Sequence, residues 1–283
     1  MPMGVAPKRY FNAHCHLELT HLRGRITSGL SFHAWVEELL KLKRKSNATD
    51  YEASVAAGLG ELRLSGTEAI LDIDSVGFAP ELIRAVPEHA ISFTEIIEFD
   101  PAKGREAVQR VLDHQMGVGP LAPHQQYGLA PHAPYTTTEP LLTAAAEAAG
   151  ERGQWLCIHV AETEAETEMF AKGTGELAGW LRSKELLPED WKAPGLRPIE
   201  YLERCGVLGP KTLLIHANEV NDRDLGIIKE RGSKVCVCPG THVFFHRGDF
   251  PLARLLEAGI PTYLGTDSAA SNNNLNLFDE MHS

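Results

Sequence analysis

The sequence predicts a (β/α)₈ TIM barrel, an α/β fold in which eight parallel strands alternate with helices. Short apolar runs alternate along the chain with longer amphipathic ones, which is typical of repeated βα units. Eight such apolar runs can be counted in the 283 residues, and polar side chains follow several of them. A doubly wound open sheet is the alternative, but the first expected βα turn lacks a glycine-rich phosphate-binding motif.

The expected strands are short apolar segments of the kind found in parallel sheets that are buried on both faces. They span residues 9–13, 69–73, 91–97, 127–130, 155–159, 212–216, 234–238 and 261–265. The intervening segments have helical periodicity, and one of them begins at Thr138, has Pro140 in its first turn and stops at Gly150. The expected helices span residues 32–43, 51–64, 104–116, 138–150, 166–181, 222–231 and 251–258. Residues 188–198 are predicted to be an insertion before the sixth strand.

Composition favours an enzyme that acts on a small molecule. The formal net charge of −11 would repel a nucleic-acid backbone, so no nucleic-acid partner is expected. No segment has the length of a membrane span and the first residues do not resemble a signal peptide, so we expect no membrane contact and a cytoplasmic location. The cysteines, including Cys157, Cys236 and Cys238 in strand-like runs, are expected to be reduced and buried.

Two histidines at the end of the first expected strand suggest a metal site. His14 and His16 are two positions apart, and alternate strand residues share a face, so both rings point the same way. Further candidate side chains fall at the ends of other strands, where a barrel would bring them together. They are His132 after the fourth strand, His159 at the end of the fifth, His216 at the end of the sixth and Asp267 after the eighth. Imidazoles and a carboxylate suit Zn²⁺, and the same set can hold Fe²⁺.

Glu162 lies three residues beyond His159 and is a candidate for proton transfer at that site. A different interpretation is that Glu162 belongs, with Glu164, Glu166 and Glu168, to a run of acidic residues that favours a helix N-terminus. Taken alone, Glu162 favours the second interpretation, because a run of acidic residues is common at a helix N-terminus.

Five motifs in order along the chain resemble the amidohydrolase superfamily. They are Asn-Ala-His-Cys-His-Leu-Glu-Leu at residues 12–19, Ala-Pro-His-Ala-Pro-Tyr at 130–135, His-Val-Ala-Glu-Thr at 159–163, Ile-His-Ala-Asn at 215–218 and Leu-Gly-Thr-Asp-Ser-Ala-Ala-Ser-Asn at 264–272. The set is most similar to the aminohydrolase branch, which contains the methylthioadenosine/S-adenosylhomocysteine, aminodeoxyfutalosine and guanine deaminases and the triazine chlorohydrolases.

The resemblance implies roles for these residues. His14, His16, His159 and Asp267 would bind one divalent metal ion, with Zn²⁺ expected first and Fe²⁺ as the alternative. His216 would orient the attacking water, with direct metal contact left open, and Glu162 would act as general acid/base while Asp267 accepts a proton. A single ion is expected because the fourth strand offers His132, a substrate contact in this scheme, and no lysine.

The implied reaction is hydrolytic deamination, in which hydroxide on the metal attacks an amino-bearing heterocycle carbon and ammonia leaves. Residues 271–276 favour a 6-aminopurine nucleoside as substrate. Hydrolysis of another C–N or C–Cl bond, as in a cyclic amide or a chlorotriazine, remains open, and so does a non-catalytic metal-binding barrel or inactive fragment.

Residues 238–247, after the seventh strand, form the expected specificity loop. His242, His246 and Arg247 within it are candidate substrate contacts, while Phe244 and Phe245 either stack on the substrate or anchor the loop. Glu18 and Glu95 are further candidates for substrate hydroxyls or charges.

Members of this branch usually carry a small β-sandwich that is built from segments on both sides of the barrel. Here those flanks are expected to be absent or truncated. Residues 1–283 are therefore expected to form a single barrel that stops in or before its last helix, with a homo-oligomer as one expected way to cover exposed apolar surface.

Overall fold

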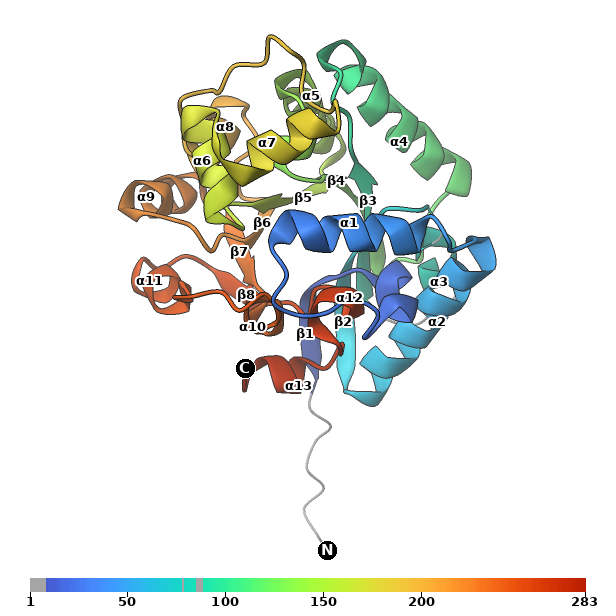
Figure 1. Ribbon diagram of the computed structural model, residues 1–283. Helices are drawn as coiled ribbons and strands as arrows, with labels where there is room; N and C mark the ends of the chain where they lie inside the picture. The colour runs from blue at the N-terminus through green and yellow to red at the C-terminus, as the bar shows by residue number, and fades with distance from the viewer. Residues whose placement is uncertain (1–8, 78, 85–88) are drawn as a thin grey trace, which may run out of the picture.

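The computed structural model describes residues 9–283 except 78 and 85–88, and it confirms the predicted (β/α)₈ barrel (Figure 1). Eight parallel strands pair in chain order from first to last. A parallel bridge joins Cys15 to Asp267, and the amide of Asp267 donates to the carbonyl of His14 at 3.0 Å. These contacts connect the end of the last strand to the first and nearly close the barrel.

The strands agree with the predicted ones to within a few residues at either end. They are β1 (Tyr10–Cys15), β2 (Thr67–Asp74), β3 (His89–Ile96), β4 (Gln125–Pro131), β5 (Trp155–Val160), β6 (Thr212–His216), β7 (Lys234–Val237) and β8 (Thr262–Leu264). β1 extends beyond the expected end at residue 13, so His14 lies within the strand and His16 follows it.

The helices differ more from prediction. Those that cover the barrel or its ends are α1 (Phe32–Lys43), α2 (Ala48–Leu64), α3 (Ala79–Arg84), α4 (Gly104–Val118), α5 (Glu139–Arg152), α6 (Glu164–Lys172), α7 (Gly175–Ser183), α8 (Pro198–Arg204), α9 (Asp222–Arg231), α10 (Pro239–Phe244), α11 (Leu252–Glu257), α12 (Ala269–Asn272) and α13 (Leu277–Glu280). Three 3₁₀ turns, η1 (Leu17–Leu22), η2 (Pro101–Lys103) and η3 (Pro134–Thr136), complete the described set.

Several predicted helix boundaries were wrong; α2, for example, begins three residues before the expected start at residue 51. In two cases a left-handed glycine explains the difference. The single helix expected over residues 166–181 is two helices, because Gly173 (φ 74°) ends α6 before α7 begins. The helix expected to stop at Gly150 continues to Arg152 and ends at Gly153 (φ 63°). Short helices such as α8 and α10 were not predicted, since six or seven residues are too few for a periodic pattern.

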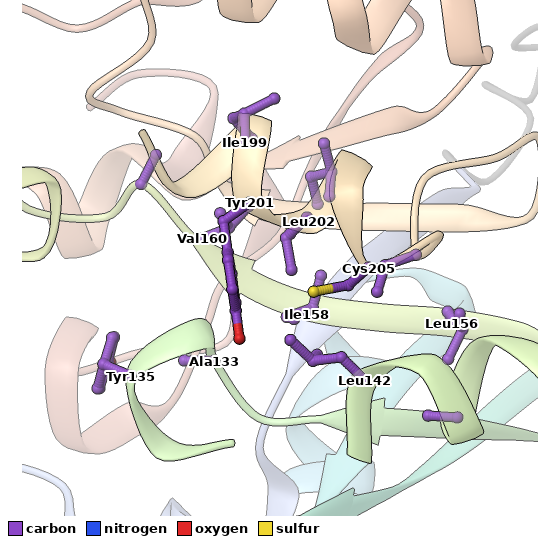
Figure 2. Close-up of a cluster of buried hydrophobic side chains, with 14 of the residues drawn as sticks. Ala133, Tyr135, Leu142, Leu156, Ile158, Val160, Ile199, Tyr201, Leu202 and Cys205 are labelled. Atoms are coloured by element: carbon purple, nitrogen blue, oxygen red, sulfur yellow. The ribbon is translucent and has the colours of Figure 1, made fainter. Parts of the chain in front are cut away.

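The core has two layers because alternate strand residues face opposite sides of the sheet. In β5, Cys157 belongs to the cluster inside the barrel, whereas Leu156, Ile158 and Val160 pack outward against the helices. Figure 2 shows part of the outer layer, where Tyr201 of α8 lies beside β5. All five cysteines are buried and unpaired, as expected. Within the described residues, no helix is long and apolar enough to span a bilayer.

Gly265 directly follows β8 and packs against His14, so a substitution there tests how packing affects the site. A Cβ at this position would lie 2.7 Å from Cys236 Sγ and 2.7 Å from His14 Cβ. We expect Gly265→Ala to lower the free energy of unfolding by about 1–3 kcal/mol through overpacking. Gly226→Ala is the control, because no atom lies within 4 Å of that Cβ and alanine favours the α9 helix. Urea unfolding measures both variants, and equal stabilities would contradict the steric argument.

Candidate active site

The carboxyl ends of the strands bring four histidines and an aspartate together. The ring centroid of His14 lies 4.8 Å from that of His16, 5.0 Å from His159 and 6.0 Å from His216. Two sets of three buried residues can each offer ligand atoms to a metal ion. Within each set, the three ligand atoms lie within 4.8 Å of one another. One set is His14, His159 and His216, and the other is His14, His16 and Asp267. His14 belongs to both sets and is the centre of the cluster.

Asp267 is held in place by the turn after β8. Its Oδ1 accepts from the Ser268 amide at 2.7 Å, and its Oδ2 accepts from the Thr241 hydroxyl at 3.0 Å. Oδ1 also lies 3.4 Å from His14 Nε2 and 3.8 Å from His16 Nε2. Burial alone would raise the pKa of Asp267, but the rings of His14, His216 and His16 outweigh it and hold that pKa well below its usual value. Asp267 is therefore a carboxylate at neutral pH.

The chemistry of the histidines fits a cation. Burial lowers the pKa of His14 to about 4 and also lowers the pKa values of His159 and His216, so these rings are neutral and have lone pairs available. The carboxylate of Glu18 overcomes burial and raises the pKa of His16 to about 9, so metal binding there would release a proton. Among the described residues, His14 Nδ1 and Nε2 and His16 Nδ1 are buried without a hydrogen-bond partner. Such atoms are costly to bury unless something binds them.

Hydrogen bonds between β1 and β8 fix the centre of this cluster. The Asn12 side chain donates to Thr266 Oγ1 at 2.7 Å, and its oxygen accepts from the Thr266 amide at 3.1 Å and the His14 amide at 3.2 Å. One buried amide therefore sets the relative position of His14 and the turn that carries Asp267.

Several strand-end residues have strained backbones. Ala161 (φ 49°), His216 (φ 71°), Ala217 (φ 48°) and Asp267 (φ 56°) all occupy the left-handed region, although none is glycine. Such strain occurs where surrounding structure enforces it, often at functional sites. Here the strained turns follow β5, β6 and β8 and aim side chains into the barrel mouth.

Glu162 follows the first of these turns and lines the same cavity as the cluster. Arg247 Nη2 donates to Glu162 Oε1 at 2.6 Å, and His216 Nε2 lies 3.7 Å from the same oxygen. The Glu162 amide donates to Glu166 Oε2 at 3.0 Å. The Glu162 carboxylate is thus buried and fixed beside the histidines, which suits a group that transfers protons.

The cavity has a volume of about 290 Å³, with a polar floor and an apolar roof. Asp267, Glu162 and three of the histidines, namely His16, His159 and His216, contribute to the floor. α1 lies across this end of the barrel (Figure 1). It supplies Phe32, Trp35 and Leu39 to the apolar part of the cavity lining, which forms the roof. Trp35 Nε1 donates to the Ala270 carbonyl at 3.3 Å, which ties α1 to α12.

His132, Glu18 and Glu95 also line this cavity. The His132 carbonyl accepts from His159 Nδ1 at 3.0 Å, so the backbone of His132 orients the ring of His159. Glu18 accepts from Ser75 at 2.8 Å, and Ser75 in turn accepts from Lys43 at 2.7 Å. All three candidates lie where a substrate could contact them.

The other three candidate substrate contacts have protein partners. His242, His246 and Arg247 are not among the described residues that line the cavity. The ring of His242 is 2.8 Å from the Gly248 carbonyl, His246 packs where a Cβ of Gly29 would lie, and Arg247 binds Glu162. From this loop Phe245 lines the cavity, whereas Phe244 is buried against α1 and η1.

Sequence reasoning missed Glu166, Thr241 and Asn12 as site residues. In the sequence, Glu166 is only one member of an acidic run. It lies four positions after Glu162, but Glu162 precedes α6, so helical spacing gave no signal of their contact. Thr241 and Asn12 act through contacts between residues that are distant in sequence, 26 and 254 positions apart, which no local pattern reveals.

Comparison with known proteins agrees with this geometry. A model of the amidohydrolase family matches residues 10–283. The chain belongs to the amidohydrolase family. The 5'-deoxyadenosine deaminase of Methanothermobacter thermautotrophicus is 32% identical over 277 residues, covering 95% of this chain and 59% of that protein. The aminodeoxyfutalosine deaminase of Deinococcus radiodurans is 30% identical over 283 residues, covering 95% of this chain and 65% of that protein. The chain thus spans about three-fifths of the length of these relatives.

Solved structures share the fold of this amidohydrolase. Helicobacter pylori aminofutalosine deaminase, in complex with methylthio-coformycin, superposes with a TM-score of 0.81 at 20% identity, covering 96% of this chain and 66% of that one. An adenosine deaminase from Xanthomonas campestris with bound zinc gives 0.77 at 21% identity, covering 95% and 58%.

Glu166 yields a prediction about stability and pH. Burial raises the pKa of Glu166 to about 8 from the ordinary glutamate value of about 4.5, so the folded state holds a proton that the unfolded state releases. Stability contributed by this group therefore falls as pH rises from about 4.5 to about 8. Glu166→Gln removes the titration and keeps an acceptor for the Glu162 amide. We expect the Tm of Glu166→Gln minus that of wild type to increase from pH 5 to pH 9, measured by calorimetry in the same metal state. A constant difference would contradict the buried, protonated assignment.

Proposed function

We propose that this chain is the catalytic barrel of a metal-dependent aminohydrolase that deaminates a 6-aminopurine nucleoside. The observation that carries the proposal is the placement of Glu162 and the His/Asp cluster around one cavity. A purely structural metal site would not need a buried acid/base group beside it. The relatives support the substrate class, since they include deaminases of 5'-deoxyadenosine, methylthioadenosine, S-adenosylhomocysteine and aminodeoxyfutalosine.

In this proposal His14, His16, His159 and Asp267 hold one divalent ion. Zn²⁺ is the first choice and Fe²⁺ the alternative, because imidazole and carboxylate ligands suit both. When bound, such an ion supplies a water of lowered pKa near neutral pH. The zinc named for the Xanthomonas enzyme supports the choice of metal.

In the proposed reaction, residues of this chain transfer protons, orient the water and bind the substrate. Asp267, a carboxylate fixed by Thr241 and Ser268, accepts a proton from the water, and His216 orients that water. As general acid/base, Glu162 takes one proton of the water and delivers it to a ring nitrogen, and the proton that Asp267 accepts passes to the amino group, which departs as ammonia. His132 and Glu18 contact the substrate from the cavity wall. The apolar residues of α1 exclude bulk water, which strengthens these electrostatic interactions.

Turnover and metal retention in a Glu162 variant test the reaction. We expect metal-loaded protein to release ammonia from at least one of adenosine, 5'-deoxyadenosine, methylthioadenosine, S-adenosylhomocysteine and aminodeoxyfutalosine. Glu162→Gln should keep its metal and lose turnover by about 10²–10⁴-fold, the range expected for a general acid/base.

The rival functions give different results in the same assay. Release of chloride from a chlorotriazine, or opening of a cyclic amide, without any ammonia from the nucleosides would replace the proposed reaction. Unchanged turnover in Glu162→Gln would remove Glu162 from the mechanism. Bound metal with no turnover of any substrate would favour a non-catalytic barrel.

Metal analysis tests the ligands independently of activity. We expect His14→Ala and Asp267→Ala to bind less metal than wild type, because each removes a ligand from the cluster. His114→Ala is the matched control, since His114 is exposed on α4. Metal content after dialysis, measured by mass spectrometry, decides the matter; full occupancy in either site variant would take that residue off the ligand list.

A further inference from the structure

The Glu162 carboxylate is held by a residue 85 positions away in the sequence. Arg247 Nη2 lies 2.6 Å from Glu162 Oε1, and the side chains of Arg247 and Glu162 are only 13% and 6% exposed. A charge-assisted hydrogen bond this short, between two buried side chains, restricts both rotamers. The ion pair lies beside the cavity, because Glu162 lines it and Arg247 does not appear among its described lining residues.

Arg247 is itself fixed by its neighbours. Its Cζ lies 4.6 Å from the ring centroid of Phe245, and its amide donates to the His242 carbonyl at 3.1 Å. The ring of Phe245 packs against Trp35 of α1 at 5.5 Å between centroids. The guanidinium is therefore placed by a closed turn and by an aromatic stack, and it does not extend freely into the cavity.

The contact distinguishes the two oxygens of Glu162. Arg247 donates to Oε1, and His216 Nε2 lies 3.7 Å from the same atom. In the part of the chain that the structure describes, Oε2 has no recorded hydrogen bond, so it is the oxygen left for the substrate. The backbone of the same residue is fixed separately by Glu166, which accepts from its amide, and by Asn218, which donates to its carbonyl at 3.1 Å.

We propose that Arg247 is a positioning residue that fixes the carboxylate of Glu162, with Oε2 turned to the reacting ring nitrogen. This assignment rests on the proposed deaminase function, and it replaces the expectation from sequence that Arg247 contacts the substrate. Proton transfer from Glu162 needs a donor oxygen within hydrogen-bonding reach of the ring nitrogen, so a small rotation of the carboxylate lowers the rate without weakening substrate binding.

The same segment positions a second carboxylate. Thr241 of α10 donates to Asp267 Oδ2, and Arg247 follows α10 by three residues. Residues 239–248 therefore contact both proton-transferring carboxylates of the proposed mechanism, one through each end of the segment.

Kinetics of Arg247 variants separate positioning from substrate binding. We expect Arg247→Met to lower kcat by about 100-fold, the cost of a displacement of about 1 Å in a catalytic group, and to leave KM within about threefold of wild type. Arg247→Lys should recover part of the lost kcat, because an ammonium can donate to one carboxylate oxygen. Arg254→Met is the matched control, since Arg254 binds Val220 and Asp222 on the outside of the barrel. A raised KM with unchanged kcat in Arg247→Met would restore the substrate-contact role and overturn the proposal.

A structural readout does not depend on turnover. In crystal structures of Arg247→Met and Arg247→Lys, we expect the Glu162 carboxylate to leave its wild-type position in the first and to keep it in the second. An unmoved carboxylate in Arg247→Met overturns the positioning role whatever the activity. If wild type deaminates no nucleoside while the carboxylate moves as expected, the proposed function fails and the positioning of Glu162 stands.

Discussion

The junction between β8 and β1 is the contact on which the site depends. Asn12 pairs with Thr266 through both ends of its amide, and the Asp267 amide donates to the His14 carbonyl. A parallel barrel has no edge only if its last strand meets its first, and here that meeting also sets His14 beside Asp267. The contacts that close the barrel are therefore the same contacts that place His14 beside Asp267. Glycine at position 265 allows both barrel closure and the placement of His14, since any Cβ there would collide with His14.

Strand periodicity was enough to predict the barrel and to bring the histidines and Asp267 together. The strands alternate faces strictly, and the carboxyl ends of all strands in this fold meet at one end, so positions such as His159 and Asp267 follow from counting. Helix boundaries were less predictable because single left-handed glycines decide them, as at Gly173. The partners of Arg247 could not be predicted, since its loop position is compatible with either the substrate or Glu162. That choice depends on tertiary contacts such as the stack on Phe245.

The apolar roof of the cavity shields the polar residues of the floor from solvent. α1 brings Trp35 and Leu39 over residues that would otherwise face open solvent, and Lys43 at its end reaches Ser75 and thereby Glu18. A low-polarity roof over the imidazoles and the carboxylates of Glu162 and Asp267 lowers the local dielectric constant, which makes each charge interaction in the floor stronger than it would be in water.

The left-handed turns after β5, β6 and β8 also limit which substitutions can stabilise this protein without harming the site. Each non-glycine residue in that region costs about 1–3 kcal/mol, so glycine at Ala161 or Ala217 would relieve strain in the folded chain. The same change would free the turns that present Glu162 and His216, so the segment could sample orientations that do no chemistry. Stabilising selection and selection for turnover therefore act in opposite directions at these positions, and heat-adapted variants should gain their stability elsewhere in the barrel.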